Sequence, residues 1–136
     1  MALRWAEVGV TYRRVRLADL EAVARAYRAV DLCLVTSRDE GGPKAVLESM
    51  ASGVPLVSTR VGQAADLVRE GENGWLCEVE DAEGLVAAAA HVADASSAEL
   101  EPVLAAARET AEKCSWNALR PQWRDLFRGF VAMEEA

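Results

Sequence analysis

Apolar residues are arranged along this chain in two ways, as short continuous runs and as longer stretches with helical spacing. The runs at 32–35 (LCLV) and 54–58 (VPLVS) are typical of strands that are covered on both faces. Around them, apolar residues recur at intervals of three and four, which predicts helices over 19–30 and 44–52. This alternation favours an α/β fold with a parallel sheet.

Two further strands and a short helix complete the first part of the chain. Residues 8–15 (VGVTYRRV) are rich in β-branched side chains and predict a strand, with its arginines suited to a sheet edge. A helix is expected over 64–70. The turn at 71–74 (GENG) then introduces a strand over 75–79. About four strands are therefore predicted in all.

The remainder of the chain is expected to be wholly helical. Asp81 is a good N-cap for an alanine-rich helix to about residue 93. Two more helices are predicted over 98–113 and 117–133. We therefore predict one domain over residues 1–136, with a βα core at about 8–95 and a helical tail at about 96–136.

Composition and charge narrow the class of protein. The chain has 136 residues, of which 51% are hydrophobic, and a formal net charge of -7, which disfavours binding to nucleic acid. Cys33, Cys77 and Cys114 lie far apart without a C-x-x-C spacing, which argues against a disulfide framework or a zinc site. The first ten residues lack the apolar core of a signal peptide. We therefore expect a cytoplasmic location.

The residues best suited to binding a ligand follow the predicted strand at 32–35. Glu40 lies in a loop of turn-forming residues over 36–43 (TSRDEGGP), directly before a helix. Ligands of open α/β sheets bind at the carboxyl ends of strands, which is where this loop is expected. Backbone amides at the loop and helix start can hold a phosphate or a sugar hydroxyl. These amides belong to Gly41, Gly42, Lys44 and Ala45.

Glu48 follows eight positions after Glu40, one turn into the same helix. A carboxylate there can accept two hydrogen bonds from a vicinal diol such as a ribose, and Glu40 can do the same for a hexose. By spacing alone, a solvated loop residue and an exposed helix residue are the favoured explanation of the pair. Lys44 is equally compatible with a plain surface lysine, and Arg38 with Asp39 favours a surface ion pair.

The stretch from Glu40 to Thr59 (EGGPKAVLESMASGVPLVST) resembles the E-x7-E motif of the retaining family 4 glycosyltransferases. Further matches to that family flank it. They are the upstream run at 26–32 (AYRAVDL), the turn at 61–63 (VGQ), the hairpin at 71–74 (GENG) and, more loosely, Ser115-Trp116. Together these matches span roughly residues 8–95.

This resemblance implies an α/β fold, a Rossmann-like three-layer sandwich with a parallel sheet that forms half of a GT-B fold, with extra C-terminal helices. It implies that Glu40 is catalytic and contacts hydroxyls of the transferred sugar. It places Gly41, Gly42 and Lys44 beside the sugar and the diphosphate, and Glu48 on the ribose. The donor is then a nucleotide-diphosphate sugar, transferred with retention, without a metal or other cofactor.

The resemblance also bears on partners. It implies that the N-terminal acceptor domain of a GT-B enzyme lies outside these 136 residues, so we expect no transferase activity from the chain alone. We expect a homodimer, because Trp116, Trp123, Phe127 and Phe130 can share one helix face. Peripheral membrane association is expected only for a full enzyme. Two alternatives are a non-catalytic remnant that binds a nucleotide sugar or oligomerises, and a nucleotide-sugar epimerase of the same architecture.

Overall fold

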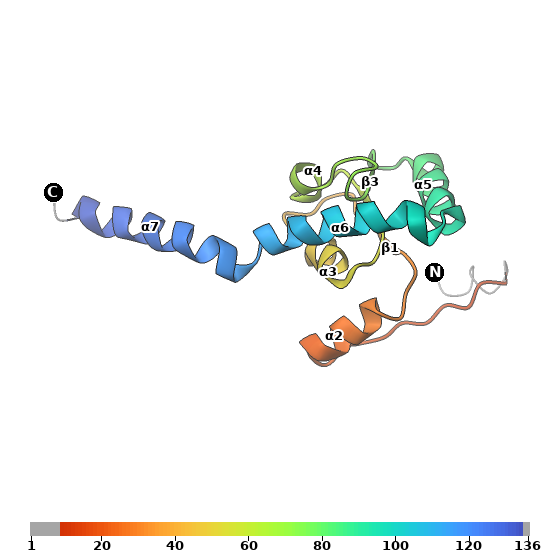
Figure 1. The fold of residues 1–136 in the computed structure, drawn as a ribbon, viewed down its shortest axis with the longest axis horizontal. Coiled ribbons are helices and arrows are strands. Elements are labelled where there is room, and N and C mark those ends of the chain that lie inside the picture. The colour runs from red at the N-terminus through yellow and green to blue at the C-terminus, as the bar shows by residue number, and fades with distance from the viewer. Residues whose placement is uncertain (1–8, 135–136) are drawn as a thin grey trace.

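The computed structural model describes residues 9–134, and Figure 1 shows their arrangement. The elements in chain order are α2 (Leu20–Tyr27), β1 (Cys33–Val35), α3 (Lys44–Ser52), β2 (Leu56–Thr59), α4 (Ala64–Leu67), β3 (Trp75–Cys77), α5 (Ala82–Asp94), α6 (Ser97–Lys113) and α7 (Trp116–Glu134). The strands form one parallel sheet in the order β1-β2-β3. The predicted α/β fold with a parallel sheet is confirmed.

The sheet is covered on both faces, which gives the expected three layers. Leu56 of β2 faces a cluster with Val46 and Met50 of α3 and Ala107 of α6. The next residue, Val57, points the other way because side chains alternate along a strand, and it packs with residues of β3 and α5. Helix α6 contributes to both clusters, so it joins the two layers.

Local signals define most helix ends. The Asp19 carboxylate accepts a hydrogen bond from the amide of Ala22 at 2.7 Å, and the Asp81 carboxylate accepts one from Gly84 at 2.8 Å. Ser96 and Glu99 form a reciprocal capping box at the start of α6. Gly53 ends α3 in the left-handed conformation with φ of 70°. These boundaries agree with the predictions to within a few residues.

The strand predicted over residues 8–15 is not present. Val8 lies outside the described residues, and residues 9–15 form no strand and are exposed to solvent. A strand requires a neighbour for its backbone hydrogen bonds, and this stretch runs on the side of α2, apart from the sheet (Figure 1). The described sheet therefore has three strands, and β1 lies at its edge with Leu34 51% exposed.

Helices α6 and α7 form an extended arm along the molecule (Figure 1). Helix α6 packs on α3, whereas α7 projects beyond the rest of the fold. The Ser115 hydroxyl accepts a hydrogen bond from the amide of Ala118 and so caps the start of α7. The α/β core is thus compact, while the last helix has little of the molecule beside it.

Candidate functional site

The loop that carries Glu40 is anchored from the neighbouring strand. Residues 36–43 follow the carboxyl end of β1, as predicted. The Thr59 hydroxyl, at the end of β2, donates hydrogen bonds to the carbonyl oxygens of Ser37 at 2.7 Å and Val35 at 3.3 Å. Glu40 itself is exposed, and the Ser37 hydroxyl donates to its Oε1 at 3.0 Å. The backbone of the loop is held while its carboxylate faces solvent.

The turn after β2 packs against the loop that carries Glu40. Gly62 lies in the turn after β2 with φ of 45°, and a Cβ atom at this position would clash with the backbone carbonyls of Glu40 and Gly41. The amide of the Gln63 side chain also donates to the carbonyl oxygen of Pro43 at 3.4 Å. Gly62 therefore has to be a glycine, because only a bare backbone fits beneath the loop of Glu40. Neither residue was among the predicted site residues.

The start of α3, which follows the loop of Glu40, has no side-chain cap. Pro43 is buried at the N-cap position, and its side chain accepts no hydrogen bond from the helix amides. No acidic residue lies in the first turn of α3. Lys44 is exposed, and the side chain of Ala45 packs against the core while its amide belongs to the first turn. The positive end of the helix dipole and the first backbone N–H groups are consequently available to an anion.

Glu48 lies further along α3 and is half-buried. The Tyr27 hydroxyl, from the end of α2, donates a hydrogen bond to Glu48 Oε2 at 3.3 Å. Both side chains line a cavity of about 400 Å³ whose other lining residues, among them Val23 and Leu34, are mostly apolar. Glu40 does not line this cavity. The two glutamates thus share one loop–helix unit, and their joint action on one ligand stays a prediction.

Charged side chains from three loops meet at the rim of this edge of the sheet. Arg38, after β1, pairs with Glu80, after β3, at 2.9 Å. Arg60, after β2, pairs with Glu78 at 2.9 Å. The predicted ion pair between Arg38 and Asp39 is therefore wrong. Loops from parallel strands gather at the same edge, so a residue 42 positions later in the sequence is the nearer partner.

The hairpin at 71–74 is held by one buried side chain. The Asn73 carboxamide accepts a hydrogen bond from the amide of Arg69 at 2.7 Å and donates to the Leu67 carbonyl and the Thr110 hydroxyl, each at 3.0 Å. It joins the end of α4, the start of β3 and α6. The geometry gives Asn73 a structural role, since all three bonds are internal to the fold.

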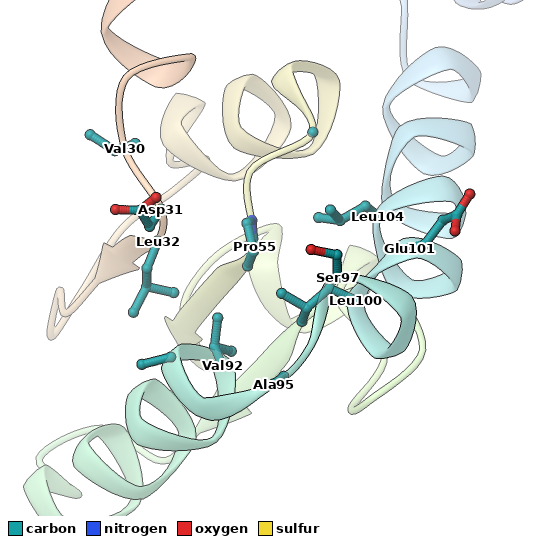
Figure 2. Close-up of a pocket in the computed structure, with 12 residues that line it drawn as sticks. Val30, Asp31, Leu32, Pro55, Val92, Ala95, Ser97, Leu100, Glu101 and Leu104 are labelled. Carbon is teal, nitrogen blue, oxygen red and sulfur yellow. The ribbon is translucent and has the colours of Figure 1, made fainter.

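A larger cavity of about 660 Å³ lies at the other end of the strands (Figure 2). It is formed by residues that precede β1 and β2, such as Asp31 and Pro55, together with the end of α5 and part of α6. Its charged lining residues, Asp31 and Glu101, are both acidic and would repel a phosphate. Despite its size, this cavity is a poorer candidate for an anionic ligand than the loop after β1.

No helix within residues 9–134 has the length and apolar character needed to cross a bilayer.

A parallel sheet covered by helices on both faces defines the chain as a Rossmann-like α/β domain. A family model described as "Glycosyl transferases group 1" matches residues 2–95. This chain belongs to that family. The GDP-mannose-dependent alpha-mannosyltransferase of Corynebacterium glutamicum is 34% identical over 116 residues, which cover 85% of this chain and 28% of the relative. The N-acetyl-alpha-D-glucosaminyl L-malate synthase of Bacillus anthracis is 39% identical over 69 residues, covering 51% of this chain and 18% of that enzyme.

Solved structures agree with this assignment. The sucrose-phosphate synthase of Thermosynechococcus elongatus matches with a TM-score of 0.82 and 28% identity, covering 97% of this chain and 33% of that one. The Anabaena protein HepE, solved with UDP and glucose, has the same fold, with a TM-score of 0.77 and 21% identity over 93% of this chain and 35% of its own. These likenesses confirm the predicted architecture, a Rossmann-like α/β fold that forms half of a GT-B fold. The chain spans about a third or less of the curated relatives it matches.

Proposed function

We propose that this chain binds the nucleotide-diphosphate sugar donor of a retaining glycosyltransferase that transfers a hexosyl group. The proposal rests on the N-terminus of α3, where no side chain caps the first backbone amides and they can donate hydrogen bonds to an anion. Contacts with Thr59 and Gly62 hold the preceding loop in place. Membership of the glycosyl transferases group 1 family supports it. HepE, with the same fold, was solved with UDP, which supports a nucleotide as the ligand.

Each predicted site residue then has a distinct role. Glu40 accepts hydrogen bonds from hydroxyls of the transferred sugar. Glu48 accepts them from the ribose diol. The diphosphate lies between them against the start of α3, where the contacting groups come from Gly41, Gly42, Lys44 and Ala45. The Lys44 ammonium adds a charge that complements the phosphates.

Retention of the anomeric configuration is consistent with a reaction on one face of the sugar. The bond from the anomeric carbon to the phosphate oxygen breaks, and a bond to the acceptor oxygen forms on the same side, while the leaving phosphate takes the acceptor proton. Holding both reactants in position can supply about 7–11 kcal/mol of barrier reduction. We propose that a second domain, outside these residues, binds the acceptor in the cytoplasm. The 136 residues alone are therefore expected to bind a donor without transferring its sugar.

Ligand-observed NMR titration tests the binding site directly. The probes are UDP, GDP and ADP, followed by UDP-glucose and GDP-mannose. Glu48→Gln is expected to weaken nucleotide binding about tenfold, because a charge-assisted hydrogen bond contributes at least about 1.5 kcal/mol. Glu40→Gln should instead reduce the preference for the sugar nucleotides over the free diphosphates.

Glu101→Gln is the matched control, because Glu101 lines the cavity at the opposite end of the strands. It should leave every affinity unchanged. An equal loss in this variant would move the site to that cavity and contradict the proposal. If none of the nucleotides binds the wild-type chain, the alternative of a non-catalytic remnant is favoured. Transfer of a sugar by the purified chain would contradict the division of roles between two domains.

A further inference from the structure

The contact between Tyr27 and Glu48 brings together two residues 21 positions apart. Tyr27 is the last residue of α2, and Glu48 lies in the second turn of α3. Within the part of the chain that the structure describes, the Tyr27 hydroxyl is the only hydrogen-bond donor to the Glu48 side chain. Hydrogen bonding within the described chain therefore orients this carboxylate through Tyr27.

The chemistry of Tyr27 suits a permanent donor. Burial raises its pKa well above its usual range, and the nearby Cys33 and Glu48 add to the effect. The phenol is consequently protonated at neutral pH, so it acts as the donor in the hydrogen bond to the Glu48 side chain. One such bond leaves most of the acceptor capacity of the carboxylate unused, since its two oxygens offer about four lone-pair sites.

The surroundings of Glu48 offer few other hydrogen-bond partners to its carboxylate. The cavity that both residues line is otherwise formed mainly by apolar side chains of α2 and β1. A half-buried carboxylate on an apolar wall needs polar partners to offset the loss of water. Tyr27 supplies one partner from inside the fold, and the remaining lone pairs are free for a ligand hydroxyl.

We propose that Tyr27 is a positioning residue for Glu48, whose bond from the phenol sets the carboxylate to accept hydrogen bonds from the ribose diol of the donor nucleotide. This inference rests on the proposed function, in which Glu48 binds the ribose. Tyr27 itself touches no ligand in this arrangement. It acts by restricting the side-chain rotation of Glu48, so that less freedom is lost when the ligand binds.

The test compares each nucleoside diphosphate with its 2′,3′-dideoxy counterpart, using UDP, GDP and ADP in the full 136-residue chain. The ratio of the two affinities, here called the diol ratio, measures only what the ribose hydroxyls contribute. Tyr27→Phe keeps the ring in place and removes the donor. It should lower the diol ratio about fivefold while leaving the affinity for the dideoxy nucleotide unchanged. Glu48→Gln should lower the ratio about tenfold, and the double variant should be no weaker than Glu48→Gln alone.

Tyr12→Phe is the matched control, because Tyr12 is the other tyrosine of the chain and is half exposed on the segment before α2. It should leave the diol ratio unaltered. A purely structural role of Tyr27 would lower thermal stability and both affinities together, with the diol ratio unchanged, and would overturn the inference.

The remaining outcomes separate the two proposals. If Glu48→Gln lowers the diol ratio and Tyr27→Phe does not, the inference about Tyr27 is wrong and the proposed function stands. If neither variant changes a measurable wild-type ratio, the assignment of Glu48 to the ribose fails, and the role of Tyr27 fails with it. A wild-type chain that binds no nucleotide would overturn both.

Discussion

Helices α3 and α7 present the same kind of sequence pattern and have opposite environments. In α3, Val46 and Met50 lie on one face and are fully buried between the sheet and α6. In α7, Trp123 and Phe127 lie on one face, stack with ring centroids 5.9 Å apart, and remain exposed. Apolar spacing therefore identifies the face of a helix that requires a partner, but it does not show that the same chain supplies one.

The position of each helix in the fold explains the difference. Helix α3 connects two adjacent strands, and a helix between parallel strands has to pack back on the sheet that they form. Helix α7 is not placed between two strands of the described sheet, and it projects beyond the core (Figure 1). Four substitutions or sets of substitutions test this contrast, in order of decreasing expected effect.

Met50→Ala should destabilise the fold strongly, while Phe127→Ala should not. Removing a fully buried methionine side chain costs about 2–5 kcal/mol, through lost burial and the cavity that remains. Phe127 is 61% exposed, and its loss should change the free energy of unfolding by no more than about 0.5 kcal/mol. Urea denaturation at low protein concentration measures both. Comparable losses in the two variants would show that α7 packs on the core in solution.

Gly62→Ala and Gly129→Ala should change the stability of the fold in opposite directions. A Cβ atom at position 62 meets the backbone of Glu40 and Gly41, and the left-handed φ adds about 1–3 kcal/mol of strain. The same substitution at position 129, in α7, meets open space and should stabilise the helix by up to about 1 kcal/mol. Thermal unfolding should show a lower melting temperature for the Gly62 variant and a higher one for the Gly129 variant. Nucleotide affinity should fall in the Gly62 variant only, and an unchanged affinity there would mean that the loop of Glu40 is not part of the site.

We propose that the 136-residue chain forms a homodimer in which the apolar face of α7 is covered by a second copy. Exposed aromatic patches of this kind tend to find protein partners. Sedimentation at micromolar concentration should show a dimer, and the double variant Trp123→Ser/Phe127→Ser should associate at least about tenfold more weakly. Gln122→Ser, an exposed polar position of the same helix, is the control. A wild-type monomer of 14.7 kDa would contradict the proposal.

The smallest effect is expected at the start of α6, the helix that joins the two regions. Hydrogen bonds from the Ser96 side chain and backbone lower the pKa of Glu99. A carboxylate whose folded pKa is lowered contributes stability above its unfolded pKa of about 4.3 and loses it as the pH falls through the folded value. The wild-type chain should therefore lose slightly more stability than Glu99→Gln below about pH 5. Identical pH profiles of the two unfolding free energies would refute this contribution.

Helix ends and turns were predictable because their causes are local. Asp19, Asp81 and Ser96 each accept a hydrogen bond from an amide three positions later, and Gly53 adopts a conformation that other residues avoid. The order of strands and helices from residue 19 onward followed from the same local periodicity. The motif around Glu40 and Glu48, together with the flanking matches at 26–32, 61–63 and 71–74, indicated the family. None of these features depends on a distant part of the chain.

The features that the sequence did not determine all require a partner far along the chain. Residues 9–15 have the composition of a strand, but no neighbouring strand accepts their backbone hydrogen bonds. The bond from Tyr27 to Glu48, the close approach of Gly62 to Glu40 and the pairing of Arg38 with Glu80 exist only because the fold brings separate loops and helices together. The exposed face of α7 has the same origin, since burial depends on what the tertiary structure places opposite a helix and not on the helix itself.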